Sequence, residues 1–307
     1  MNQGIRIICT FASNLREFII RNQVAVMKRV VFVMMVAGML LSSCQGQKST
    51  AGAEGESSDS TQTVDTTATT LQEEIAEGAP MPKAADELFD DFIFNFAANK
   101  KLQSSRVKFP LKVTRGEEVS YVSKGQWQME YFFMNQDFYT LLFNSEEEME
   151  RVKESTTIEH AVVEKIYLDA KTVKQFVFDR VKGVWMLQEV IHMPLSESSN
   201  ASFLWFYDKF SKDEDQYQSK HLAESVKFVG PDPDDDFAQM EGVITPDTWE
   251  AFSPDLPSGM IYNIVYGTPQ HETNRKIFVL RGIANGLEIE LTFKHEGDRW
   301  ILTKMVT

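Results

Sequence analysis

Residues 89–96 read Phe-Asp-Asp-Phe-Ile-Phe-Asn-Phe, and residues 203–210 read Phe-Leu-Trp-Phe-Tyr-Asp-Lys-Phe. In both stretches large apolar side chains recur at positions i, i+3, i+4 and i+7, the spacing of one face of an α-helix. These side chains are Phe89, Phe92, Ile93 and Phe96 in the first stretch and Phe203, Phe206, Tyr207 and Phe210 in the second. The spacing therefore predicts two amphipathic helices, 114 residues apart, each burying an aromatic stripe.

The similarity between the two regions continues beyond these helices. Four further pairs of segments follow in the same order: Val107–Phe109 and Val226–Phe228, Tyr139–Phe143 and Tyr262–Tyr266, Lys165–Leu168 and Lys276–Val279, and Phe178 with Trp185 and Phe293 with Trp300. Five matches in one order predict an internal duplication, with a first repeat over residues 84–195 and a second over residues 196–307.

The end of each repeat is predicted to be β-structure. Leu287, Ile289, Leu291 and Phe293 alternate with polar residues, which is the pattern of a strand with one buried face. Asn285-Gly286 before this strand is typical of a tight hairpin turn. A helix followed by an antiparallel sheet predicts an α+β fold in which each helix packs on a curved sheet.

The N-terminal region has the features of an export signal. Basic Lys28-Arg29 precedes an apolar run over residues 30–41, which as a helix spans about 18 Å, against the roughly 30 Å of a bilayer core. Residues 41–44, Leu-Ser-Ser-Cys, resemble a bacterial lipobox, which implies that Cys44 is the acylated first residue of the mature chain. An ordinary signal peptide with a chance cysteine is the alternative. Residues 27–43 are then the signal peptide, and residues 1–26 are interpreted as an over-extended start.

Residues 44–83 are predicted to be a disordered tether. The stretch is rich in Ser, Thr, Gly, Ala and acidic residues, and such a composition buries too little apolar surface to compensate for ordering. Asp59-Ser60-Thr61 and Asp65-Thr66-Thr67 resemble the envelope O-glycosylation sites of Bacteroidetes, which implies Ser60 and Thr66 as candidate acceptors.

A lipobox followed by a duplicated helix-and-sheet unit resembles the Bacteroidetes lipoproteins of unknown function with nuclear transport factor 2-like (cystatin-like) domains. The resemblance rests on the order of the elements, the Phe stripes and the Phe–Trp pairs. It implies two cone-shaped domains, each a concave sheet half-closed by a helix. It implies no catalytic residue, because that superfamily has no universal active site.

Composition and motifs exclude several classes of function. With 31 Lys+Arg against 45 Asp+Glu the net charge is −14, which disfavours nucleic-acid binding. The sequence contains no nucleotide-binding glycine loop, nucleophile elbow or zinc motif, so no cofactor or metal is expected. Residues 232–236 space their acids like a calcium loop, but Phe237 and Val243 replace the required Gly and Glu. A solvated acidic loop is the better interpretation.

Four residues are candidates for a pocket. His160 and His192 lie on predicted strands, and either could form an acid–base pair with Glu130 or Glu164. Trp185 and Trp300 could line a ligand site. The competing interpretation is that the histidines are hydrogen-bonded core residues and that the tryptophans are core anchors.

Two functions follow as hypotheses. The favoured one is a non-catalytic lipoprotein of the cell envelope, held in a bacterial membrane by an N-terminal lipid, that binds a partner protein or a small apolar ligand. The alternative is an isomerase, dehydratase or hydrolase that uses the cone of one repeat. A cavity with a buried carboxylate or His facing a donor would favour the enzyme, and cones filled by Phe and Trp would favour binding.

Overall fold

The computed structural model describes residues 86–155, 157–232, 235–267, 273–283 and 285–307. These residues belong to one compact unit. The predictions for the signal peptide, the tether, Cys44, Ser60 and Thr66 lie outside the described residues. Within the described part, no helix combines the length and the apolar content needed to cross a bilayer.

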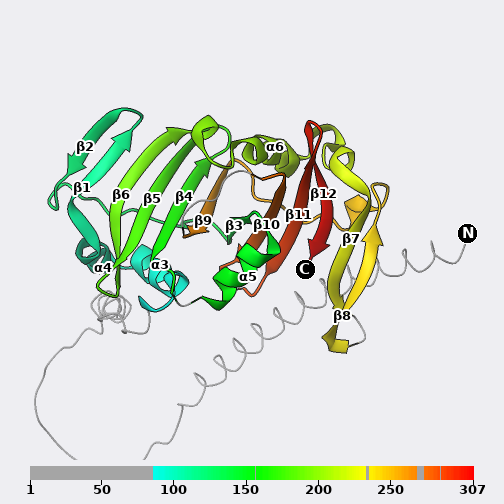
Figure 1. The fold of residues 1–307 in the computed structure, drawn as a ribbon, viewed down its shortest axis with the longest axis horizontal. Helices are drawn as coiled ribbons and strands as arrows, with labels where there is room; N and C mark the ends of the chain where they lie inside the picture. Colours follow the sequence, from blue (N-terminus) through cyan, green and yellow to red (C-terminus); the bar gives the residue numbers. More distant parts are fainter. Residues whose placement is uncertain (1–85, 156, 233–234, 268–272, 284) are drawn as a thin grey trace, which may run out of the picture. The chain divides into compact units, whose positions relative to one another are not determined.

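The described part is a mixed α+β structure of one large sheet and a few helices (Figure 1), which confirms the predicted class. The helices are α3 (Phe89–Ala98), α4 (Lys100–Ser105), α5 (Glu146–Glu154) and α6 (Ala201–Lys212). The strands are β1 (Val107–Arg115), β2 (Glu118–Val122), β3 (Phe138–Phe143), β4 (His160–Tyr167), β5 (Thr172–Val181), β6 (Val184–Pro194), β7 (Leu222–Asp232), β8 (Asp235–Ile244), β9 (Met260–Tyr266), β10 (Arg275–Gly282), β11 (Glu288–Glu296) and β12 (Arg299–Val306).

The twelve strands form a single continuous sheet in the order β2-β1-β6-β5-β4-β9-β3-β10-β11-β12-β7-β8. The two central strands, β9 and β3, are parallel to each other. Antiparallel pairing joins β9 to β4 on one side and β3 to β10 on the other. At the centre of the sheet, β9 from the C-terminal half of the chain therefore adjoins the strands of the N-terminal half, and β3 from the N-terminal half adjoins those of the C-terminal half.

The predicted helix over residues 89–96 is confirmed as α3, and its aromatic stripe is buried. The ring centroids of Phe89, Phe92 and Phe96 lie 5.4, 5.8 and 5.3 Å from that of Phe178 in β5. Trp185 in β6 is 1% exposed and packs against Phe89 at 4.9 Å. Aromatic side chains thus fill the space between α3 and the sheet.

The second predicted helix is confirmed as α6, and it has a similar environment. Phe203, Phe206 and Phe210 surround Phe293 of β11, with ring centroids 5.3, 5.4 and 5.2 Å from it. Trp300 of β12 packs edge-on against Phe203 at 5.3 Å. The predicted strand around residues 287–293 is confirmed as β11.

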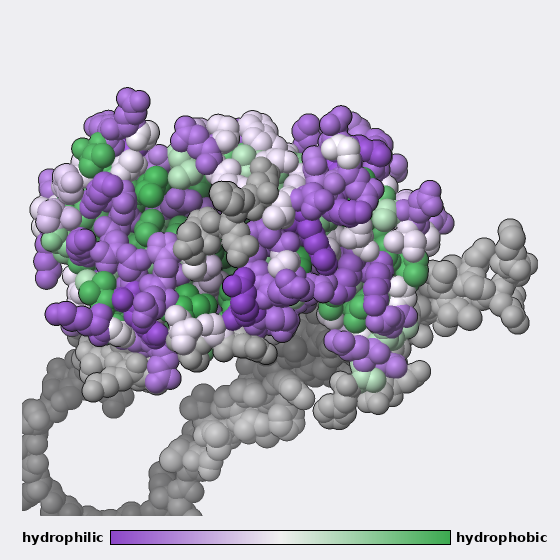
Figure 2. All heavy atoms as spheres, in the orientation of Figure 1, coloured by the Kyte–Doolittle hydropathy of each residue, from purple (hydrophilic) through white to green (hydrophobic). Residues whose placement is uncertain are grey.

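The two helices cover opposite faces of the sheet. In β10, Phe278 contacts Phe203 and Tyr207 of α6, whereas Ile277 and Val279 belong to the core beneath α3. Adjacent residues of a strand point to opposite faces, so α3 and α6 lie on different sides. Figure 2 shows that one exposed side is mostly hydrophilic, with apolar side chains in separate patches.

Candidate functional site

A cavity of about 210 Å³ lies at the centre of the sheet, on the face that α3 covers. Most of its wall is apolar, formed by Leu88, Phe89, Leu141, Phe143, Met149, Val152 and Ile158. Asp90, Lys153, Tyr266 and Arg281 add polar groups to it. Apart from Leu88 and Ile158, these residues come from α3, α5 and the central strands β3, β9 and β10. The cavity therefore depends on the meeting of β9 and β3 at the middle of the sheet.

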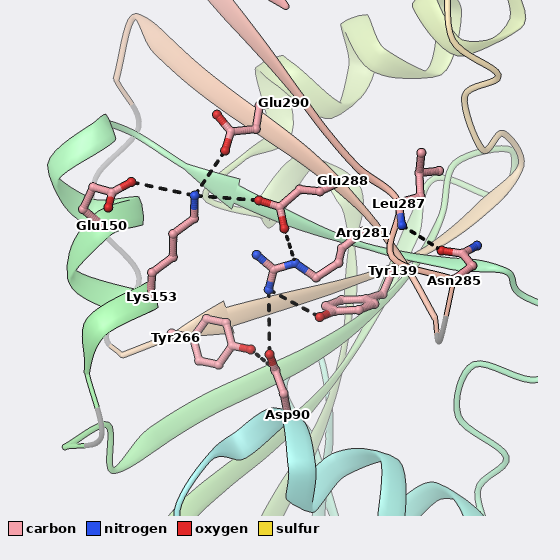
Figure 3. Close-up of polar contacts among 10 residues, drawn as sticks. All are labelled: Asp90, Tyr139, Glu150, Lys153, Tyr266, Arg281, Asn285, Leu287, Glu288 and Glu290. Atoms are coloured by element: carbon pink, nitrogen blue, oxygen red, sulfur yellow. Dashed lines mark hydrogen bonds and ion pairs between the residues drawn. The ribbon is translucent and has the colours of Figure 1, made fainter. Parts of the chain in front are cut away.

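The polar end of the cavity is a cluster centred on Asp90 (Figure 3). The Tyr266 hydroxyl donates a hydrogen bond to Oδ1 of Asp90, and Arg281 Nη1 lies 3.8 Å from Oδ2. The Arg281 guanidinium also donates to the Tyr139 hydroxyl at 3.5 Å and to Glu288 Oε2 at 2.8 Å. A half-buried carboxylate is thus held by a hydroxyl and a cation.

The surroundings of the cluster set its protonation. Burial raises the pKa of the Asp90 carboxyl, although the hydrogen bond from Tyr266 and the charge of Arg281 act in the opposite direction. Burial, together with the negative charge of Asp90, raises the pKa of Tyr139 to about 12. The same two causes raise the pKa of Tyr266 well above its ordinary value. Both tyrosines therefore keep their protons at neutral pH and act as hydrogen-bond donors.

Lys153 of α5 lies beside this cluster and binds three carboxylates. Its Nζ is 3.3 Å from Glu290, 3.7 Å from Glu288 and 3.7 Å from Glu150 (Figure 3). Burial works against the charged form of Lys153, but these carboxylates outweigh it and raise the pKa of the lysine. Both cations that line the cavity, Lys153 and Arg281, are already paired with carboxylates, which favours a neutral ligand over an anion.

The cluster suits recognition more directly than chemistry. Asp90 and Arg281 already have partners, and no serine, cysteine or histidine is among the residues that line the cavity. A carboxylate can accept about four hydrogen bonds, so Asp90 retains the capacity to accept one from a ligand. In the described ranges, no group of three or more His, Cys, Asp and Glu side chains could hold a metal ion.

The two candidate histidines lie away from this cavity. His160 Nδ1 is 2.7 Å from Asp179 Oδ1 in the neighbouring strand β5, and both side chains are partly exposed. His192 lies near the end of β6 beside Arg115 and Lys174. The charge of Glu130 acts to raise the pKa of His192, so these two residues, one of the proposed acid–base pairs, lie near each other.

The other proposed acid, Glu164, is buried in a polar row on the face opposite α3. Its carboxylate accepts hydrogen bonds from Gln175 Nε2 and Asn263 Nδ2, both at 2.8 Å. Asn263 in turn lies 3.3 Å from the Thr140 hydroxyl. Burial raises the pKa of Glu164, while these two hydrogen bonds act in the opposite direction.

Trp185 and Trp300 are 1% and 3% exposed, and neither lines the central cavity. Trp300 donates its indole hydrogen to Ser202 Oγ at 3.0 Å. Both tryptophans contact a phenylalanine of the adjacent helix, Phe89 and Phe203 respectively. This placement is that of the core anchors given above as the competing interpretation.

The residues of the central cavity were not identified from the sequence. Asp90 lies within the stretch 89–96, which was interpreted by its apolar residues. Tyr139 and Tyr266 were used only as evidence for the duplication. Arg281 follows an apolar run and had no distinguishing spacing. The first turn of α3 holds two acidic residues, Asp90 and Asp91, and the sequence pattern does not distinguish between them.

Comparison with known proteins places this fold in a family. Residues 67–307 match the model described as "Domain of unknown function (DUF4348)". A crystal structure of an NTF2-like protein from Bacteroides fragilis is 38% identical, with a TM-score of 0.67 over 74% of this chain and 98% of that one. No curated protein matches. The chain is therefore a member of the DUF4348 family, with an NTF2-like protein of Bacteroides fragilis as a structural relative.

Proposed function

We propose that this protein is a lipid-anchored binding protein of the bacterial cell envelope that takes a small, neutral, largely apolar ligand into the cavity between α3 and α5. The anchor is the lipid on Cys44, residues 44–83 are the tether, and residues 84–307 are the binding part. The lipobox-like residues 41–44 and the short apolar run before them support the anchor.

The binding part consists of two repeats that have exchanged one strand each. Two observations support this. Three phenylalanines of a helix surround Phe178 in one half and Phe293 in the other. The strand order from the two edges of the sheet is also equivalent, β2-β1-β6-β5-β4 on one side and β8-β7-β12-β11-β10 on the other. In this arrangement β3 and β9 are counterparts that have changed places. One of the matched segment pairs shifts by four residues. Lys276 lies opposite Phe293, and the residue opposite Phe178 is Ala161, so Ala161 rather than Lys165 is the counterpart of Lys276.

The observation that carries the binding function is the apolar cavity of about 210 Å³ with the Asp90 cluster at one end. An engineered apolar cavity of about 150 Å³ binds benzene, so this volume suits a ligand with a single ring or a short chain. Asp90 offers an acceptor for a ligand hydroxyl or N–H, and the pairing of Lys153 and Arg281 with carboxylates disfavours anions. Aromatic side chains fill the core around Phe178 and Phe293, so an apolar ligand finds room in this cavity rather than there.

Titration with single-ring probes, followed by protein NMR, tests the proposal. Phenol and aniline should shift the resonances of Leu141, Val152 and Tyr266, whereas benzoate of similar size should bind more weakly. Val152→Phe should fill the cavity from the α5 side and abolish the shifts. Val181→Phe, the same change at a site that is 43% exposed, is the matched control and should leave them unchanged. Equal binding to both variants would contradict this site.

An acid–base enzyme is the second candidate, and the raised pKa of Asp90 beside a protonated tyrosine favours it. The two candidates differ in what Asp90→Asn should do. In a binding protein the asparagine side-chain oxygen still accepts a hydrogen bond, so phenol binding should fall only a few-fold. In an enzyme the same change would abolish turnover while binding persists.

A further inference from the structure

Four basic side chains occupy a single row across four neighbouring strands, β1, β6, β5 and β4. Arg115 of β1 is directly opposite His192 of β6, His192 is opposite Lys174 of β5, and Lys174 is opposite Lys165 of β4. Side chains at directly opposite positions project from the same face. These four residues, here called the basic row, therefore share one surface.

The basic row is energetically unfavourable unless something offsets it. Like charges directly opposite each other destabilise a sheet, and this row stands in a chain with a net charge of −14. Glu130 compensates part of it, with its oxygens 2.6 Å from Lys174 Nζ and 3.6 Å from Lys165 Nζ. With Glu118 of β2 opposite Arg115, the row has two carboxylates against three permanent cations.

Arg115 is the least compensated member of the row. Within the residues that the structure describes, its guanidinium has no ion pair or side-chain hydrogen bond. Glu118 is opposite it on the edge strand β2 but is exposed, and no ion pair between them is formed in this structure. The next basic residue along β1, Lys112, projects from the other face, where it pairs with Glu189 at 2.9 Å.

A cavity of about 660 Å³ opens above this row. Arg115, Lys174 and His192 provide its charged wall, and Tyr167, Met193 and Pro194 provide an apolar one. Its volume falls within the range of about 300–1,000 Å³ that is usual for small-molecule sites. The cavity thus combines a positive wall with a surface on which a carbon skeleton can rest.

We propose that this cavity binds a small, soluble organic anion through a phosphate or carboxylate group. The planar guanidinium of Arg115 suits two parallel hydrogen bonds to such a group, and Lys174 adds a point charge. The ligand supplies the negative charge that the basic row lacks. Burial and the charges of Arg115 and Lys174 lower the pKa of His192, with Glu130 acting in the opposite direction, which agrees with a positive potential in the cavity.

This site is independent of the cavity at Asp90. The two have no lining residue in common, and they call for different ligands. Loss of one site therefore leaves the other testable.

Calorimetric titration of the full chain with pyrophosphate and with citrate at low salt tests the anion site. Arg115→Gln should weaken binding about tenfold, which corresponds to the loss of a charged hydrogen bond. Lys112→Gln removes the same charge from the same strand on the opposite face and should change the dissociation constant less than about twofold. Glu130→Gln should tighten binding, because it removes the competing internal carboxylate.

The gain expected for Glu130→Gln separates the proposal from a loss of folding, since a misfolded variant does not bind more tightly. Absence of binding to both probes by the unaltered chain would overturn the proposal. So would an equal loss in the Arg115 and Lys112 variants, which would indicate non-specific attraction.

Discussion

Thr140 of β3 lies directly opposite Asn263 of β9, and their side-chain oxygens are 3.3 Å apart at the parallel junction in the middle of the sheet. Asn263 also donates a hydrogen bond to the buried carboxylate of Glu164 in β4. This short polar row therefore joins strands from both halves of the chain. The junction makes the sheet continuous, and it has consequences for stability.

Asn263→Leu should destabilise the protein by about 1–3 kcal/mol, because it removes one of the two hydrogen bonds that the buried Glu164 carboxyl group accepts. Asn263 is fully buried, and no solvent molecule can readily replace the lost donor. Urea unfolding measures the change. The double variant Glu164→Met/Asn263→Leu should recover most of the loss, since it also removes the unsatisfied carboxylate. If the double variant lost the sum of the two single effects, the two side chains would not be coupled.

Glu164→Gln should change how stability depends on pH. The pKa of Glu164 is raised in the folded protein, so the stability that it contributes is fully present below its ordinary value of 4.5. That contribution is lost as the pH rises through the raised value. The free energy of unfolding of the unaltered protein should therefore fall, relative to that of the variant, as the pH rises from 4.5. A difference between the two that is constant with pH would show that Glu164 does not titrate differently on folding.

Trp185→Ala and Trp300→Ala should each cost about 3–5 kcal/mol, as is usual for truncating a large buried aromatic side chain. Both changes should shift one and the same unfolding transition. The reason is that β9 pairs with β4 and β3 with β10, so neither half can unfold without removing a strand from the other. Calorimetry distinguishes this from two separate transitions, which two independent domains would show.

Cys44→Ala should move the protein from the membrane fraction to the soluble envelope fraction, because it removes the residue proposed to carry the lipid. Fractionation of cells that produce the variant measures this. Ser43→Ala, which keeps a small residue before the cysteine, should remain in the membrane and serves as the control. Membrane partitioning that is unaltered in Cys44→Ala would exclude a lipid on this residue.

Several features could be predicted from local sequence patterns. The period of the aromatic residues indicated α3 and α6, and the alternation around Ile289 and Phe293 indicated β11. These predictions succeed because the spacing of apolar residues within one helix or strand indicates which of its faces is buried. The lipobox-like residues 41–44 and the tether are likewise read from the sequence alone, and they stay predictions.

The pairing of strands was decided only by the tertiary structure. The residues of β3 and β9 do not indicate which strands they pair with, because both strands are apolar enough to occupy any central position in the sheet. That pairing brings Tyr266 and Arg281 against Asp90. The basic row depends in the same way on the register of four strands. Local periodicity specifies which side of an element is buried, whereas contacts between distant residues form only when the sheet assembles.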